Sequence, residues 1–162
     1  MEQIELFEGS LIYESEIRRN KILSLVALLS SEASAKPKIR TPMDTYAYLS
    51  PFIAKEQEHF VVLLLNSAQR VIKTHLVTIG LANRVLVHPR EIFKEAIRLN
   101  AVALIAGHNH PSANLEPSDE DIIMSRRLYE AGELLGINVL DHVIVGTCGY
   151  YSFIESRGSM KD

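Results

Sequence analysis

Short, almost wholly apolar runs bounded by polar residues mark the interior of this chain. Two of them, residues 60–66 (FVVLLLN) and residues 101–107 (AVALIAG), have the length and flanks of buried β-strands. Residues 71–80 (VIKTHLVTIG) alternate between apolar and polar side chains after the turn segment NSAQR, which predicts the return strand of a hairpin. Further along, INVLDHVIVG and YYSFIE predict two closing strands around the turn TCG.

Apolar residues at helical spacing predict three helices among these strands. The first begins near Pro42, which suits a first helical turn, and Pro51 is expected to bend or end it. The others are predicted at residues 89–100 and at residues 118–136, where Gly136 stands in the position of a helix C-cap. The order of hairpin, helix, strand, helix and two strands predicts an α/β domain with a mixed β-sheet and flanking helices.

Residues 1–40 are expected to form an N-terminal arm and linker ahead of one domain at residues 41–162. A length of 162 residues leaves little room for a second core. Within the arm, four apolar residues share one face of a predicted helix, and a stretch rich in Ser, Ala and Lys follows them. These four residues are Ile22, Leu25, Val26 and Leu29.

The composition is that of an ordinary globular protein, with 47% apolar and 23% charged residues. Seventeen Lys and Arg against twenty Asp and Glu give a net charge of −3, which argues against a protein built mainly to hold a phosphate backbone. The single Cys148 excludes an internal disulfide and a Cys-rich zinc module. No run reaches the roughly 18–20 apolar residues of a membrane span. The N-terminus also lacks the pattern of a signal peptide, so we expect a cytoplasmic protein without a membrane partner.

Residues with metal-binding chemistry follow the predicted strand at residues 101–107. His108 and His110 are two residues apart, so both imidazoles point the same way in an extended chain. Asp121 falls in the first turn of the next predicted helix, whose start is expected to return beside this loop. Two imidazoles and one carboxylate form a set of ligands suited to zinc, with the fourth position open to water.

Each of these residues also has a purely structural interpretation. Ser118, ahead of three acidic residues, is a good helix N-cap, and a lone H-x-H pair lies more often in a loop than at a metal. The complete pattern H-x-H-x7-S-x2-D changes this balance, because random ordering of this composition would produce it in only about 6 of 10,000 sequences. Its position at a strand-to-helix junction further favours a functional site.

This pattern is the JAMM motif, and the chain resembles the JAB/MPN-domain metalloproteases that carry it. The segments EHFVVLLLN, HPREIFKEAIRLNA, GHNHPS, PSDED and GINVLDHVIVG resemble the RadC-like branch of that family, from about residue 41 to residue 155. The resemblance implies a JAB/MPN domain, whose α/β layout is similar to that of cytidine deaminases. Two departures are visible. Residues 1–40 are too short for the helix-hairpin-helix region usual in full-length RadC proteins. Ala113 stands where RadC-like chains commonly have glycine, with a small expected effect on the loop.

The resemblance implies a role for each residue of the motif. His108, His110 and Asp121 would bind Zn²⁺, which activates water for the cleavage of a peptide or isopeptide amide bond in a peptide or protein substrate. Ser118 would donate a hydrogen bond to the developing oxyanion.

The family's remaining catalytic residue is a glutamate upstream, at the start of the first core strand, where it exchanges protons with water and the leaving amine. Glu58, directly before the first apolar run, matches this position. Glu56 is the rival, because it shares a strand face with Glu58 if the strand extends back. Glu58 is preferred because it adjoins the rigid strand.

Other interpretations lead to different functions. RadC-like proteins are traditionally linked with DNA repair, so the alternative to a zinc hydrolase is an accessory protein that acts on or near nucleic acid. A third possibility is a binding module with a structural metal, which would normally have four protein ligands. A nucleotide deaminase is disfavoured, because the chain has no H-x-E and only one Cys.

His142 is interpreted either as a buried core histidine or as a group near the pocket, and His59 is expected to point away from the face of Glu58.

Overall fold

The structure, a computed structural model, describes residues 18–19, 21–24, 37–80 and 87–158. The chain divides into two units, residues 1–36 and residues 37–162, and the sheet with its helices belongs to the second. The arm and linker expected at residues 1–40 stay a prediction. The predicted apolar stripe from Ile22 to Leu29 lies largely outside the described residues.

Five strands form one mixed sheet in the order β2-β1-β3-β4-β5. Strand β1 (His59–Leu65) pairs antiparallel with both β2 (Val71–Ile79) and β3 (Ala103–Asn109). Strand β3 pairs parallel with β4 (Asn138–Gly146), which pairs antiparallel with β5 (Gly149–Ser152). The predicted α/β class with a mixed sheet and flanking helices is confirmed.

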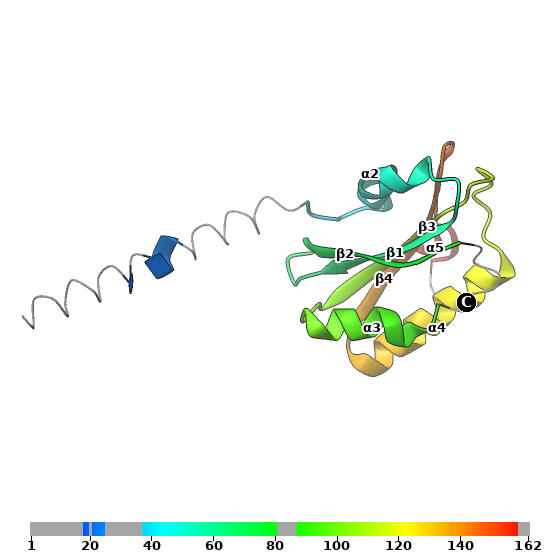
Figure 1. The fold of residues 1–162 in the computed structure, drawn as a ribbon. Helices are drawn as coiled ribbons and strands as arrows, with labels where there is room; N and C mark the ends of the chain where they lie inside the picture. Colours follow the sequence, from blue (N-terminus) through cyan, green and yellow to red (C-terminus); the bar gives the residue numbers. More distant parts are fainter. Residues whose placement is uncertain (1–17, 20, 25–36, 81–86, 159–162) are drawn as a thin grey trace, which may run out of the picture. The chain divides into compact units, whose positions relative to one another are not determined.

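Helices cover both faces of the sheet (Figure 1). Helix α2 (Pro42–Ile53) lies on one face, and α3 (Pro89–Arg98) and α4 (Asp119–Leu135) lie on the other. Helix α2 continues past Pro51 and ends at Ile53, so this proline lies inside the helix. Among the described residues, no helix combines the length and apolarity needed to cross a membrane.

Strand β1 contributes to two hydrophobic cores, because successive side chains of a strand point to opposite faces. Val61 and Leu63 pack in the core that contains Leu49 of α2. Val62 and Leu64 pack in the core beneath α3 and α4. The sheet is therefore buried on both sides, and the end of a central strand can place polar groups in a protected position.

Helix α2 and β3 approach each other closely at Gly107. A Cβ atom at this position would collide with the side chain of Leu49 and lie 3.4 Å from the carbonyl oxygen of Val143. The close packing therefore requires glycine at the residue that immediately precedes His108.

The predicted strand at residues 150–155 is wrong in its second half. Strand β5 ends at Ser152, and helix α5 (Phe153–Arg157) follows directly. Ser152 is the helix N-cap, because its Oγ accepts a hydrogen bond from the backbone N–H of Glu155 at 3.1 Å. Phe153 is buried and stacks on the ring of His142, with centroids 5.0 Å apart. The cap and this tertiary contact stabilise a helix where the alternating sequence predicted a strand.

Candidate metal centre

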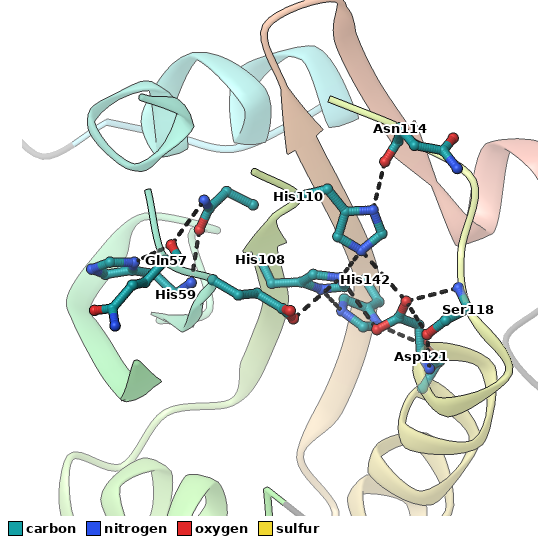
Figure 2. Close-up of polar contacts among 11 residues, drawn as sticks. Gln57, His59, His108, His110, Asn114, Ser118, Asp121 and His142 are labelled. Atoms are coloured by element: carbon teal, nitrogen blue, oxygen red, sulfur yellow. Dashed lines mark hydrogen bonds and ion pairs between the residues drawn. The ribbon is translucent and has the colours of Figure 1, made fainter. Parts of the chain in front are cut away.

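The end of β3 brings two imidazoles to one point (Figure 2). His108 is 1% exposed, and its ring stacks on Phe60 of β1 with centroids 5.9 Å apart. His110 lies just past the strand, and its N–H donates to the carbonyl oxygen of Val145 at 3.1 Å, which keeps the chain extended. The Nε2 atoms of the two histidines are 2.9 Å apart, as expected for residues two apart in an extended segment.

Helix α4 adds a carboxylate to the two imidazoles. Asp121 lies in the first turn of the helix and is 6% exposed. Its Oδ1 is 3.2 Å from His108 Nε2, and its Oδ2 is 3.6 Å from His110 Nε2. Figure 2 shows the three side chains converging from β3 and the start of α4. One ligand atom from each residue lies within 4.8 Å of the others, so the group could hold one metal ion.

Hydrogen bonding prepares His110 to bind a cation. Its Nδ1 lies 2.6 Å from the carbonyl oxygen of Asn114, which can only accept, so Nδ1 carries the proton. Neutral His110 therefore presents a lone pair at Nε2, directed at His108 and the carboxylate of Asp121. Electron-rich atoms packed this closely repel one another unless a cation lies between them. The donor set therefore fits a divalent metal ion.

The charges of the site have the signs that a metal requires. Burial alone would raise the pKa of Asp121, but the adjacent imidazoles of His108 and His110, in their protonated form, and the hydroxyl of Ser118 hold this pKa far below its usual range. The interaction with Asp121 in turn raises the pKa of His110. Asp121 is therefore ionised at neutral pH and can neutralise part of the charge of a bound cation.

Glu58 lies beside the histidines, just before β1. Its side chain is 17% exposed, and its Oε1 is 3.9 Å from His108 Nε2. Glu56 is exposed and lines the same cleft. Of the two glutamates that the sequence left open, Glu58 has the contact with a metal-site imidazole. The catalytic role of either residue stays a prediction.

Asn109 ties the segment around Glu58 to β3, which the motif did not reveal. The side chain is fully buried, and its Oδ1 accepts a hydrogen bond from the N–H of His59 at 2.7 Å. Its Nδ2 donates to the carbonyl oxygens of Lys55 at 3.2 Å and Gln57 at 3.1 Å. In the sequence, Asn109 stands out only as the residue between the two histidines of the motif, just after the apolar run.

Ser118 caps α4 and contacts Asp121 at the same time. Its backbone N–H and its hydroxyl donate to Asp121 Oδ2 at 2.8 Å and 2.6 Å, and its Oγ accepts from the N–H of Asp121 at 3.2 Å. This arrangement is a capping box with aspartate as the third helical residue. The predicted N-cap is confirmed, and the cap also orients the carboxylate of the metal centre.

The remaining histidines lie in different surroundings. His142 is fully buried, and burial, followed by the nearby His108, lowers the pKa of its imidazole well below the usual value. The ring of His59 lies near Phe52 of α2, with centroids 5.9 Å apart, so it points away from the face of Glu58 as expected. His88 caps α3, with its Nδ1 accepting from the N–H of Arg90 at 3.1 Å.

An open cleft of about 700 Å³ leads to His110. Among the described residues that line it, three are acidic and none is Lys or Arg, so this part of the lining is negatively charged. The charged and hydroxyl-bearing lining residues are Glu56, Glu58, Ser112, Glu116 and Ser118.

Residues 39–159 match the family model described as the RadC-like JAB domain. The chain belongs to the RadC-like JAB family. A UPF0758 protein of Staphylococcus aureus strain NCTC 8325 is 51% identical over 120 residues, which cover 74% of this chain and 55% of that protein. A UPF0758 protein of Staphylococcus haemolyticus strain JCSC1435 is 47% identical over 129 residues, which cover 79% of this chain and 57% of that protein. The chain spans about half the length of these relatives, and neither name states an activity.

Ala113 has a special position in the loop of this RadC-like domain. Its φ is 60°, in the left-handed region that favours glycine. Glycine, the residue that the resemblance leads us to expect here, would adopt this conformation without strain. In this chain Ala113 adopts it at a strain of about 1 kcal/mol.

Proposed function

We propose that this RadC-like JAB domain is a zinc-dependent hydrolase of the JAMM type that cleaves a peptide or isopeptide amide bond. One observation carries the proposal. Ligand atoms of His108, His110 and Asp121 converge within 4.8 Å of one another at a cleft that Glu58 also lines.

The choice of zinc follows from the donor atoms. Two imidazoles and one carboxylate are a common ligand set of catalytic zinc, whereas magnesium and calcium prefer oxygen ligands alone. His108, His110 and Asp121 would hold the ion through the atoms that already face one another. When bound, zinc supplies a Lewis acid that polarises a carbonyl group and lowers the pKa of a water molecule toward about 7.

Glu58 is proposed to move the proton. Its carboxylate lies 3.9 Å from His108 Nε2 and borders the cleft, so it is within reach of a water molecule at the site. In this proposal the carboxylate accepts a proton from the attacking water and passes it to the leaving amine nitrogen. Asn109 bonds to the backbone on both sides of Glu58, which keeps the carboxylate near this position.

Ser118 is proposed to donate a hydrogen bond to the substrate carbonyl oxygen as negative charge develops on it. In the structure this hydroxyl donates a hydrogen bond to Asp121 Oδ2, and Ser118 also lines the cleft. The proposed role therefore needs a rotation of the hydroxyl from the carboxylate toward the substrate.

The cleft supports a peptide segment as the substrate. It is open to solvent, and its acidic lining favours neutral or positively charged residues beside the scissile bond. A substrate with several carboxylates next to this bond would be repelled by Glu56 and Glu116.

Elemental analysis of the purified protein tests the metal site. The wild type should contain about one zinc ion per chain, and His108→Ala and Asp121→Ala should contain little. His88→Ala is the matched control, because it removes an imidazole that caps α3 and does not line the cleft. Equal zinc in all four proteins would refute the metal site. A peptide-library cleavage screen with the zinc-loaded wild type then tests the reaction.

The role near nucleic acid stays a prediction. A salt-dependent DNA affinity that survives the loss of the metal ligands would support it.

A further inference from the structure

A buried series of hydrogen bonds joins two of the proposed metal ligands. His108 Nδ1 lies 2.9 Å from His142 Nε2, and His142 Nδ1 lies 2.5 Å from Ser125 Oγ. Ser125 Oγ in turn donates to the backbone carbonyl oxygen of Asp121 at 2.8 Å. The series therefore begins at a ligand on β3, passes through β4 and ends at a ligand on α4.

Bulk water has little access to this series. His142 is 0% exposed and Ser125 is 2% exposed. The ring of His142 stacks on Phe153 and lies near Phe60, with centroids 5.0 Å and 5.5 Å away. Each buried nitrogen must therefore find its partner within the series, because an unpaired polar group in such surroundings is costly.

We propose that His142 and Ser125 position His108 for metal binding by fixing which nitrogen of His108 carries the proton. This inference rests on the proposed metal site, and it assigns a role to two residues outside the JAMM motif.

The last acceptor of the series fixes the position of each proton before it. A carbonyl oxygen only accepts, so the hydroxyl proton of Ser125 points at Asp121. The Oγ of Ser125 then accepts from His142 Nδ1, which leaves His142 Nε2 without a proton. His142 Nε2 accepts from His108 Nδ1, and the lone pair of His108 is at Nε2, facing His110 and Asp121.

The opposite direction of donation is incompatible with metal binding. If Ser125 donated to His142 Nδ1, His142 would donate from Nε2 to His108 Nδ1. The proton of His108 would then be on Nε2, 3.2 Å from Asp121 Oδ1, where the metal must bind. The bond from Ser125 to the Asp121 carbonyl therefore selects the tautomer of His108 that can act as a ligand.

Zinc affinity, measured by competition with a chromogenic chelator, tests the role of His142. His142→Phe keeps an aromatic ring between Phe60 and Phe153 but removes the acceptor, and the affinity should fall about 10–100-fold. His142→Gln, whose side-chain oxygen can accept from His108, should recover most of this loss. Zinc bound by His142→Phe as tightly as by the wild type would overturn the proposal.

A pair of serine variants tests the end of the series. Ser125→Ala should weaken zinc binding several-fold, by a smaller factor than His142→Phe. Ser152→Ala is the matched control, because this serine is also 2% exposed and bonds to a buried partner, Asp141, outside the series. The control should lose stability but keep its zinc affinity. An equal loss of affinity in both serine variants would contradict a specific role of Ser125.

Nitrogen-15 NMR of the full chain shows which ring nitrogen of each histidine carries the proton, and a purely structural role of His142 would not require one particular nitrogen. The imidazole protons of His108 and His142 should both be on Nδ1, and Ser125→Ala should shift part of His142 to the Nε2–H form. A wild-type His142 with its proton on Nε2 overturns the inference, even if His142→Phe fails to fold. If the wild type binds zinc and folded His142→Phe binds it with the same affinity, the positioning role is refuted and the proposed function is not. An absence of zinc binding by the wild type refutes the proposed function and the positioning role together.

Discussion

The side-chain oxygen of Asn109 accepts a hydrogen bond from the backbone N–H of His59 at 2.7 Å. Asn109 stands between the two histidines of the proposed metal centre, and His59 directly follows Glu58. One buried amide therefore connects the proposed metal ligands to the proposed proton acceptor.

Asn109→Ala tests this connection. The substitution removes the Asn109 hydrogen bonds of the His59 N–H and of two backbone carbonyl groups, so the free energy of unfolding should fall by about 1–3 kcal/mol. Peptide cleavage should fall about 10–100-fold while zinc content stays unchanged, because the Glu58 segment shifts and the ligands do not. Asn66→Ala is the control, since the side-chain oxygen of Asn66 also accepts from backbone N–H groups, those of Ala68 and Arg70 in the β1–β2 turn. Equal loss of activity in both variants would contradict the role of Asn109.

Glu58→Gln tests the proton acceptor. The amide cannot accept the proton, so the rate of cleavage should fall about 100-fold or more, with zinc still bound. Glu56→Gln removes the same charge from the same cleft farther out and should change the rate little. Zinc content and a pH profile of cleavage for all three proteins give the measurement. If Glu56→Gln shows the larger loss, Glu56 is the proton acceptor.

Ser118→Ala separates the two roles of this residue. Loss of the helix cap should lower the free energy of unfolding by about 1 kcal/mol. Loss of the donor to the oxyanion should lower kcat about 100-fold. Thr41→Ala removes the hydroxyl of the equivalent capping box on α2, so it should destabilise the fold without changing kcat. A Ser118→Ala protein that keeps its kcat would show that Ser118 acts as a cap alone.

Asp141→Asn tests the effect of a buried carboxyl group on stability. Burial raises the pKa of Asp141, even though Ser152 and the N–H groups of Ile154 and His142 donate to it. A raised pKa in the folded state means that the protonated form is favoured, so this contribution to stability is lost as the pH rises through the pKa. The wild type should therefore lose stability relative to Asp141→Asn as the pH rises above about 4, the ordinary pKa of an aspartate. Urea unfolding at a series of pH values from this point upward measures the difference, and a relative gain by the wild type would contradict the dominance of burial.

Local patterns were sufficient to predict the strands of the sheet and the convergence of His108, His110 and Asp121. Apolar runs of strand length defined β1 and β3, and two histidines two apart at a strand end had to face the same way. Helix α5 was missed because its start depends on Phe153 packing against His142, a contact that no local pattern contains.

The roles of Asn109 and His142 were also beyond local patterns. Asn109 bonds to backbone groups more than fifty positions earlier in the chain, and His142 meets His108 across two paired strands. Hydrogen-bond partners of this kind are selected by the register of the sheet. Residue spacing alone could therefore identify the groups proposed to bind a metal, but not the groups proposed to orient them.

Helix α2 supplies none of the proposed reacting groups, yet it packs on the residue that precedes His108. The side chain of Leu49 occupies the space that a side chain at position 107 would need. A relative with alanine or serine at position 107 must therefore carry a smaller residue than leucine at position 49, or that side chain or its helix must shift. These two positions are thus expected to vary together during divergence, although neither of them takes part in the chemistry.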